Sequence, residues 1–407
     1  MNKSIKLITA VLLLSSSVAT AQVADSIQQY RRGMAFDRKE ATTAGGTVTS
    51  ERLSHKTSIN ASNSLYGLIP GLYTIQNANT AWGDAATMYI RGLGTTNSRT
   101  PLIMIDGFER GIEDITVQEI ESITVLKDAA ALALYGVRGA NGVVYIKTKR
   151  GVVGKPVINF NYEFNFGTPN RLPKFVDGYT YAQALNEGLR NDGLSPRYSQ
   201  RELDAFRDQT YPYFYPNVDW WDEALRDHSY GDNVNFNIQG GSEKVRYFAQ
   251  LNWLDDRGIL KPVSDNEGYS GQLKYSKVNI RTNLDIQATK TTQVQIGMLG
   301  NFAEHNRPGA TAGNLFGALY QVPSGAFPVK TANGLWGGSD IYSNNPVAYI
   351  SGMGYARSQS RALYADMNIM QDLSAVTPGL SASMQIGFDS NGSYWDNNTR
   401  TFAYESA

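Results

Sequence analysis

The sequence predicts a compact α+β domain followed by an antiparallel transmembrane β-barrel that is incomplete. Residues 101–151 alternate short apolar strands with a helical turn and several glycines. From residue 157 onward, segments of strand length instead alternate apolar and polar residues. The connections between these segments are alternately short and long, which is typical of barrels with short periplasmic turns and long outer loops.

The chain begins with the features of a signal peptide. Two lysines accompany an apolar stretch over residues 5–14, and Ala19-Thr20-Ala21 fits the small-residue cleavage site of a leader peptidase. We therefore expect residues 1–21 to be removed on export and residues 22–44 to form a short periplasmic segment. The apolar stretch is shorter than the roughly 18 residues that a membrane-spanning helix needs, so strands are expected to enter the membrane.

The first folded unit is expected over residues 45–151. Strands are predicted at 101–105, 120–125 and 143–147, with a helical turn at 128–135. Glycine tolerates the tight reversals that such short elements require. The glycines at these joints are Gly107, Gly136, Gly139 and Gly142.

Three runs of sequence in this unit carry a resemblance to a known family. They are PLIMIDG at 101–107, IESITVLKDAAALALYG at 120–136 and RGANGVVYIKTKRG at 138–151, and MYIRG at 88–92 precedes them. In wording and order they resemble the plug domain of SusC/RagA-type TonB-dependent outer-membrane transporters.

The resemblance implies an outer-membrane importer of glycans or oligopeptides that is gated by its plug. Its implied partners are a SusD-like surface lipoprotein, the TonB-ExbB-ExbD energy-coupling complex and outer-membrane lipid. Such receptors need an extended segment before the plug that adds as a strand to TonB. The candidate residues for this contact are Val23, Ala24, Asp25, Ser26 and Ile27. Two alternatives are a siderophore or vitamin receptor with the same kind of plug, and a surface binding or adhesion protein that transports nothing.

Residues 152–407 are expected to form the first part of the barrel. About eight strands would close only a narrow barrel, whose lumen is filled by its own side chains. A plug of this size fits instead in a barrel of about 22 strands. We therefore expect the chain to be the N-terminal portion of a longer protein. The clearest alternating segments are 157–166, 245–253, 278–286, 294–302, 363–369 and 380–388.

Two groups of residues are candidates for function. Arg91 and Arg138 are expected to pair with the barrel wall, because guanidinium groups in a polar lumen need carboxylate partners. These pairs either reshuffle when the plug moves or only hold it in place. A second group is an aromatic run in the first long loop, which stacks on sugar or peptide, contacts a lipoprotein lid, or keeps the loop ordered. Its members are Tyr211, Tyr213, Phe214, Tyr215, Trp220 and Trp221.

Composition and motifs argue against other classes of function. The formal net charge is +0, without long basic runs, so nucleic acid is not an expected partner. The sequence has no cysteine, and its three histidines lie far apart. It contains no hydrolase, zinc-protease or P-loop motif. We therefore expect no catalytic residues, no metal site and no cofactor.

Overall fold

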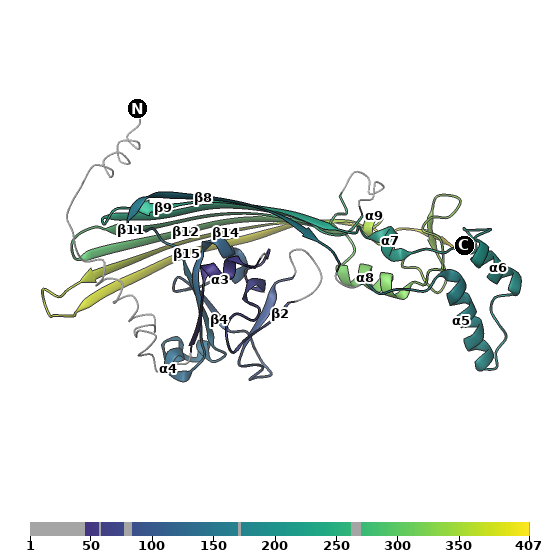
Figure 1. The fold of residues 1–407 in the computed structure, drawn as a ribbon, viewed down its shortest axis with the longest axis horizontal. Coiled ribbons are helices and arrows are strands. Elements are labelled where there is room, and N and C mark those ends of the chain that lie inside the picture. Colours follow the sequence, from purple (N-terminus) through teal and green to yellow (C-terminus); the bar gives the residue numbers. More distant parts are fainter. Residues whose placement is uncertain (1–44, 57, 77–83, 170–171, 262–269, 407) are drawn as a thin grey trace, which may run out of the picture.

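The computed structural model describes residues 45–56, 58–76, 84–169, 172–261 and 270–406. The expected signal peptide, the segment 22–44 and the candidate TonB contact at 23–27 lie outside the described residues. The described chain forms an α+β domain, called the plug below, beneath one long curved sheet, called the wall (Figure 1). A region of helices and loops continues beyond one end of the wall.

The plug is built on a five-stranded sheet with the order β1-β6-β7-β4-β5. Strand β4 is parallel to β7, and the other neighbours are antiparallel. Strands β2 and β3 form a separate hairpin-like pair. The strands are β1 (Gly45–Thr49), β2 (Leu72–Gln76), β3 (Ala86–Ile90), β4 (Leu102–Ile105), β5 (Phe108–Glu109), β6 (Ile120–Leu126) and β7 (Val143–Thr148).

Short helical turns connect these strands. The sequence predictions for β4, β6 and β7 are confirmed to within a residue at each end, and the predicted turn at 128–135 corresponds to α4 and the start of η4. Apolar side chains buried between the sheet and these turns form the plug core. The turns are α3 (Ser50–Ser54), η1 (Asn63–Leu65), η2 (Ile112–Asp114), η3 (Val117–Glu119), α4 (Ala129–Leu132) and η4 (Ala133–Gly139).

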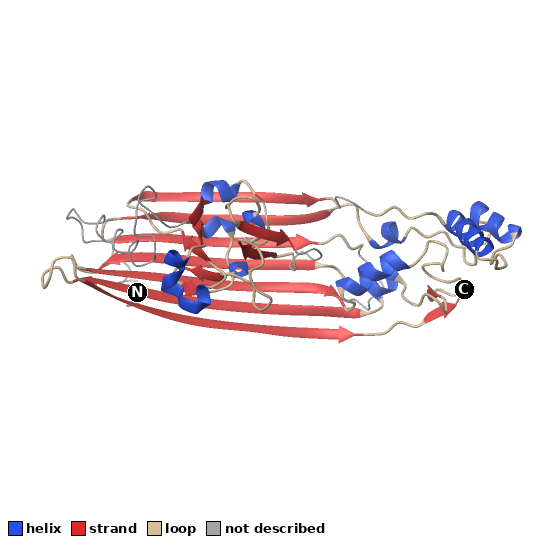
Figure 2. Cartoon of the chain, turned by 90° about the horizontal axis from the view of Figure 1, so that it is seen from below, coloured by secondary structure: helices blue, strands red, loops and turns tan. Residues whose placement is uncertain are grey.

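The wall is a seven-stranded antiparallel sheet with the order β8-β9-β10-β11-β12-β14-β15. Its strands lie side by side over nearly the whole length of the sheet (Figure 2). The described residues therefore give seven wall strands where about eight were expected. They are β8 (Gly154–Gly167), β9 (Ser229–Gly241), β10 (Val245–Arg257), β11 (Lys274–Gln287), β12 (Thr292–Pro308), β14 (Gly354–Asp372) and β15 (Ser381–Thr399).

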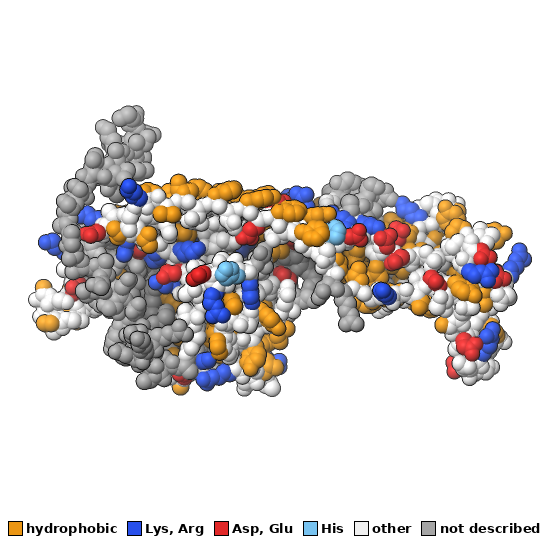
Figure 3. Space-filling view, in the orientation of Figure 1, with side chains coloured by type: hydrophobic (Ala, Val, Ile, Leu, Met, Phe, Trp, Pro, Cys, Tyr) orange, Lys and Arg blue, Asp and Glu red, His pale blue; other side chains and the backbone are white. Residues whose placement is uncertain are grey.

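Side chains alternate between the two faces of the wall, and the polar face is the buried one. On β11, Ile280 is 54% exposed whereas its neighbour Arg281 is 2% exposed. Figure 3 shows apolar side chains along the outer face of the sheet. This inverted polarity is expected where lipid covers one face of a barrel wall and a polar interior lies behind the other. No helix among the described residues is long and apolar enough to cross a membrane.

The predicted alternation of connection lengths is confirmed by the order of the elements. Short turns join β9 to β10, β11 to β12 and β14 to β15, and the longer connections lie at the other end, called the loop end below. Among the described residues, the helices outside the plug lie in the longest connections. Trp220 and Phe327 pack in the common core of these connections. The elements there are α5 (Gly178–Asn191), α6 (Gln200–Asp208), α7 (Trp220–Ala224), α8 (Ala312–Gln321), α9 (Pro346–Ser351), and the parallel pair β13 (Trp336–Gly338) and β16 (Tyr404–Ser406).

Candidate functional site

The plug meets the wall through the short turns that follow β5. Turn η3 places Glu119 at this contact, because the backbone N–H of Thr116 donates to Glu119 Oε1 at 2.5 Å and closes a capping box. The other carboxylate oxygen of Glu119 accepts a hydrogen bond from Nε of Arg281 on β11. The side chains of Glu119 and Arg281 are 0% and 2% exposed. Both partners of this ion pair are therefore removed from water.

Asp106 brings a second carboxylate to Arg281. It lies between β4 and β5 at φ 50°, and its oxygens accept from the backbone N–H of Thr148 at 3.0 Å and from the Thr148 hydroxyl at 2.5 Å. Arg281 Nη1 lies 3.7 Å from Asp106 Oδ2. Burial alone would raise the pKa of Asp106, but the charges of Arg281 and Arg150 outweigh it and hold this pKa below its usual value. Asp106 therefore stays ionised at the contact.

Arg150 joins the plug to the wall just after β7. Its Nε donates to Asp285 Oδ1 at 2.8 Å. Its Nη2 donates to the backbone oxygens of Leu284 at 3.2 Å and Ile296 at 3.5 Å. In the ion pair with Asp285 the plug supplies the cation and the wall supplies the anion. In the pair between Glu119 and Arg281 the plug supplies the anion and the wall supplies the cation. Plug and wall thus each contribute at least one buried cation and at least one buried anion, which fixes their relative position.

Side chains on the inner face of the wall also satisfy the backbone of the plug turns. Nδ2 of Asn279 donates to the carbonyl oxygen of Asp114 at 2.6 Å, and Nδ2 of Asn301 reaches the same oxygen at 3.2 Å. Such carbonyls would lose a hydrogen bond on burial if the wall were apolar here. Further contacts join Asn283 to the carbonyl of Lys149 (2.6 Å) and to Thr148 Oγ1 (2.9 Å), Gln250 to Thr116 Oγ1 (2.9 Å), and Lys277 to the carbonyl of Glu113.

A second anchor, called the Arg110 clamp below, fixes the β5 edge of the plug. The Arg110 guanidinium is 2.8 Å from Asp366 Oδ1 on β14 and 2.8 Å from Asp389 Oδ1 on β15. It lies 4.9 Å from the ring centroid of Phe108 and 4.8 Å from that of Tyr364. The Arg110 side chain is 2% exposed. Two carboxylates on adjacent strands and two aromatic rings therefore hold one plug residue.

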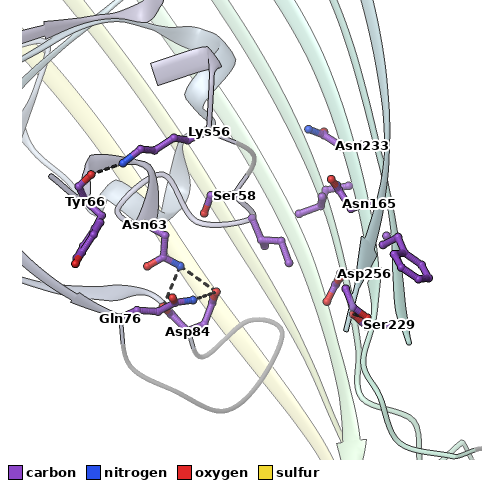
Figure 4. Close-up of a pocket in the computed structure, with 15 residues that line it drawn as sticks. Lys56, Ser58, Asn63, Tyr66, Gln76, Asp84, Asn165, Ser229, Asn233 and Asp256 are labelled. Carbon is purple, nitrogen blue, oxygen red and sulfur yellow. Dashed lines mark hydrogen bonds between the residues drawn. The ribbon is translucent and has the colours of Figure 1, made fainter. Parts of the chain in front are cut away.

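Two polar cavities lie between the plug and β8. The outer one is nearer the loop end and has a volume of 660 Å³; Figure 4 shows the residues that surround it. On its plug side, the Asp84 carboxylate accepts hydrogen bonds from the amides of Asn60 (2.5 Å), Asn63 (2.9 Å) and Gln76 (3.2 Å). Burial raises the pKa of Asp84, against the opposing effect of these amides. The inner cavity measures 340 Å³ and lies further from the loop end.

Among the described residues, Arg91 and Arg138 have partners inside the plug, and neither pairs with the wall strands described above. Arg91 lies 3.8 Å from Asp128, and Arg138 pairs with Glu109, so in the described residues both form ion pairs inside the plug. Their side chains are 59% and 66% exposed. The pairs with the wall are made instead by the four charged plug residues described above, Asp106, Arg110, Glu119 and Arg150.

The joint glycines serve two different geometries. Gly107, Gly136 and Gly142 have positive φ, as expected for tight reversals. Gly139 does not: it ends a helical turn, and a Cβ there would lie 2.9 Å from Cβ of Tyr135. Close packing, not a left-handed backbone, therefore favours glycine at position 139.

The aromatic run divides into buried and exposed members. Trp220 and Trp221 lie in the core of the loop region, and Tyr215 packs edge-on against Phe206, so these three help to order the loop. Three members remain exposed and available to a ligand or partner: Tyr211 (53%), Tyr213 (49%) and Phe214 (72%). Among the described residues, no cluster of three or more His, Cys, Asp or Glu side chains could hold a metal ion.

Comparison with known proteins gives matches over both the plug and the wall. Residues 37–143 match the family model described as the TonB-dependent Receptor Plug Domain. TonB-dependent receptor P26 of Formosa agariphila is 29% identical over 76% of this chain and 29% of its own length. TonB-dependent receptor SusC of Bacteroides thetaiotaomicron is 32% identical over 53% of this chain and 21% of its own length.

A solved structure shares the fold. The RagAB peptide importer in its open-open state superposes with a TM-score of 0.69, at 20% identity, over 88% of this chain and 42% of the other. The matched region spans less than a third of the length of the curated relatives named above. The wall is therefore a partial barrel that follows the plug.

Proposed function

We propose that this chain carries the plug and first barrel strands of a SusC/RagA-type TonB-dependent receptor and belongs to an active importer in the outer membrane. The match to the plug family model and the similarity to SusC and RagAB support this proposal. The observation that carries the proposal is the plug–wall contact, where ionised groups are buried in pairs on the polar inner face of the wall. A plug held in this way closes the barrel while it is in place. Import requires that an energised partner displace it.

We further propose that the substrate is a glycan or an oligopeptide and that a SusD-like lipoprotein acts with the receptor at the loop end. The names of the relatives support this choice, since one is SusC and another is a peptide importer. Tyr211, Tyr213 and Phe214 are exposed at the loop end and offer aromatic surface to a sugar, a peptide or the lipoprotein. The segment at 23–27 is the proposed TonB contact, by strand addition.

A reversible cross-link between plug and wall tests whether the protein transports. Thr116 of the plug and Gln250 of the wall meet through side chains, with Gln250 Nε2 2.9 Å from Thr116 Oγ1, and the sequence has no cysteine that would interfere. A short bis-maleimide whose spacer contains a disulfide joins the two thiols of Thr116→Cys/Gln250→Cys without requiring the close approach of a direct disulfide. We expect the cross-linked receptor to bind fluorescent oligosaccharides or oligopeptides at the cell surface without importing them. Reduction should restore uptake, and each single variant serves as the control.

The same experiment separates the proposal from its alternatives. An adhesion protein would bind its ligand equally with the lock open or closed and would import nothing in either state. After reduction, a siderophore receptor would import an iron chelate but would import neither labelled oligosaccharides nor labelled oligopeptides. Either result would contradict the proposed function.

A further inference from the structure

The outward face of the wall changes from apolar to charged as its strands approach the loop end. On β10, the outward residue Trp253 is 41% exposed, and Arg257 lies two outward positions beyond it. On β14, Leu363 is 46% exposed, and Arg361 is the next outward residue toward the loop end. A lipid-facing wall is expected to change in this way where the hydrocarbon layer ends and the headgroups begin. This line across the strands is called the outer boundary below.

The outer boundary crosses the wall obliquely. Leu363 on β14 lies in the same register row as Phe160 on β8, through the paired residues of the strands between them. On β8, the outward apolar residues continue beyond this row to Phe166, which is 56% exposed. Strands that are tilted by about 35–45° in a membrane produce such an oblique line. The change of polarity therefore follows a membrane plane and not the register of the sheet.

Four cations lie just beyond the outer boundary on β10, β11 and β14, and they are called the basic border below. The side chains of Arg257, Lys274 and Arg357 are 58%, 48% and 47% exposed. Arg361 is also exposed, and its guanidinium lies 5.8 Å from the centroid of the Phe302 ring. No carboxylate among the described residues pairs with Arg361. The three strands are each paired on both sides within the wall, so the border does not depend on a free edge of the sheet.

The acidic partners of the basic border leave it with an excess of positive charge. Arg257 and Lys274 share one carboxylate, that of Asp255, each at 3.1 Å, and the Asp255 side chain is 4% exposed. Arg357 lies 2.6 Å from Glu304 on β12, whose side chain is 32% exposed. On the outward face of β10, β11, β12 and β14, four cations beyond the boundary thus accompany two carboxylates, one of which is buried.

This excess of positive charge is local. Two outward aspartates, Asp232 on β9 and Asp396 on β15, flank the basic border on the neighbouring strands. They accept hydrogen bonds from the hydroxyls of Tyr162 at 2.7 Å and Tyr355 at 3.1 Å. The basic border is therefore a patch with acidic sides and not a ring of cations around the wall.

The same strands carry no comparable charge where they meet the short turns. The outward residues nearest the turns are Val245 on β10, Ile286 on β11 and Gln371 on β14. The lysines at this end, Lys244 and Lys290, lie in the turns themselves. On these described strands, outward cations therefore stand at the loop-end boundary of the apolar band and not at the opposite one.

We propose that the basic border binds the phosphate groups of the glycolipid that forms the outer leaflet of an outer membrane. The proposal rests on the proposed function for the location of the protein and for the outward direction of the loop end. Guanidinium and ammonium groups form charge-assisted hydrogen bonds with phosphate, while the apolar band beside them contacts acyl chains. A zwitterionic headgroup would not neutralise an excess of positive charge, whereas a glycolipid phosphate does.

Native mass spectrometry of the detergent-solubilised receptor, titrated with lipid, tests this proposal. The probes are a bis-phosphorylated disaccharide glycolipid, the same glycolipid without phosphates, and phosphatidylglycerol. Arg361→Gln removes an exposed cation without leaving a buried carboxylate unpaired. Arg361→Lys keeps the charge, and Lys290→Gln removes a cation from the short turn between β11 and β12 as the matched control.

We expect the phosphorylated glycolipid to bind more tightly than either of the other probes. Arg361→Gln should weaken this binding about fivefold, the contribution of one cation at an anionic lipid surface. Arg361→Lys should keep most of the binding, and Lys290→Gln should leave it unchanged. Equal binding of the glycolipid with and without phosphates, or an unchanged affinity in Arg361→Gln, would overturn the proposal. Equal binding of phosphatidylglycerol would overturn the assignment to the glycolipid.

These outcomes are distinguishable from failure of the importer function. Lipid binding is measured on the purified receptor, whether or not any oligomer is taken up, and the reversible cross-link reports uptake whether or not the glycolipid binds. Phosphate-dependent binding without reducible uptake would refute the importer alone. Reducible uptake without phosphate-dependent binding would refute the basic border as a glycolipid site.

Discussion

Removing Arg281 should strongly destabilise the docked plug. The Arg281 side chain faces Glu119, which is 0% exposed, and Asp106, which is 7% exposed. Arg281→Met keeps most of the volume and removes the charge that balances both carboxylates. Deleting one partner of a buried ion pair costs about 3–5 kcal/mol, because the other charge is left without compensation.

This cost can be measured as a shift in urea. For m values of about 1–3 kcal/mol per molar urea, a loss of about 3–5 kcal/mol lowers the midpoint by about 1 M or more. The assay incubates outer membranes in urea, applies a brief protease pulse and quantifies the surviving plug. The matched control is Arg281→Met with Glu119→Gln, which removes one of the stranded charges and should recover a large part of the shift.

Acid gives an independent check of the same reasoning. In the wild type, Asp106 has a lowered pKa, so its stabilisation is fully present above its ordinary pKa of about 3.9 and is lost only as the pH falls through the lowered value. Without Arg281, less positive charge opposes the effect of burial, so the pKa of Asp106 rises. Protonation of Asp106 at low pH then removes a buried charge that has lost its partner, which reduces the destabilisation of the variant. The gap between variant and wild type should therefore be smaller at about pH 5 than at about pH 8. Equal midpoints, or a gap independent of pH together with no recovery in the double variant, would refute the assigned network.

Three further changes have defined outcomes in stability assays. Arg110→Ala breaks the Arg110 clamp and should lower the urea midpoint of plug release about as much as Arg281→Met, whereas Arg138→Ala removes an exposed pair worth about 0–1 kcal/mol. Gly142→Val forces a branched side chain to φ 88° with its Cβ 2.6 Å from Ile90 and should cost at least about 1–3 kcal/mol. Its control is Gly45→Val, whose Cβ would lie 3.5 Å from the carbonyl oxygen of Val125; similar protease resistance of the Gly142→Val and Gly45→Val variants would contradict this expectation. Trp220→Ala removes a side chain that is 3% exposed and should cost about 3–5 kcal/mol of loop-region stability, visible as new protease cleavage there.

Local patterns predicted the wall because strand alternation is a property of neighbouring residues. The polar positions of β11, among them Lys277, Asn279, Arg281 and Asp285, follow the two-residue period of the sequence and face the plug in the structure. The turns of the plug could be predicted for the same reason, because turn signals also depend on neighbouring residues. The capping box from Thr116 to Glu119 also carries a sequence signature, which could have marked Glu119 as a fixed carboxylate.

Local sequence patterns could not predict which plug residues pair with which wall residues. Glu119 and Arg281 are 162 residues apart, and no local pattern links two such positions. Arg91 and Arg138 stand in glycine-rich motifs that attract notice, yet their side chains are exposed and satisfied within the plug. An aromatic run is similarly ambiguous, since the same residue types build a ligand surface or the core of a long loop. Burial decides whether an arginine pairs across the contact and whether an aromatic side chain forms a ligand surface or a core. Burial in turn depends on the tertiary fold.

The chemistry of the contact fits the proposed gating, in which the plug is held firmly and can still be removed. An apolar contact of this size would gain free energy from every buried square ångström, at about 25 cal/mol. Buried ion pairs instead offset their attraction with the cost of desolvating both charges, so their net contribution is small while any misplacement is penalised heavily. The contact through Arg281, Asp285 and the Arg110 clamp therefore specifies one docked position without binding it irreversibly. When the plug moves, these groups return to water and regain the hydration that docking removed. The proposed gating by an energised partner requires such a balance.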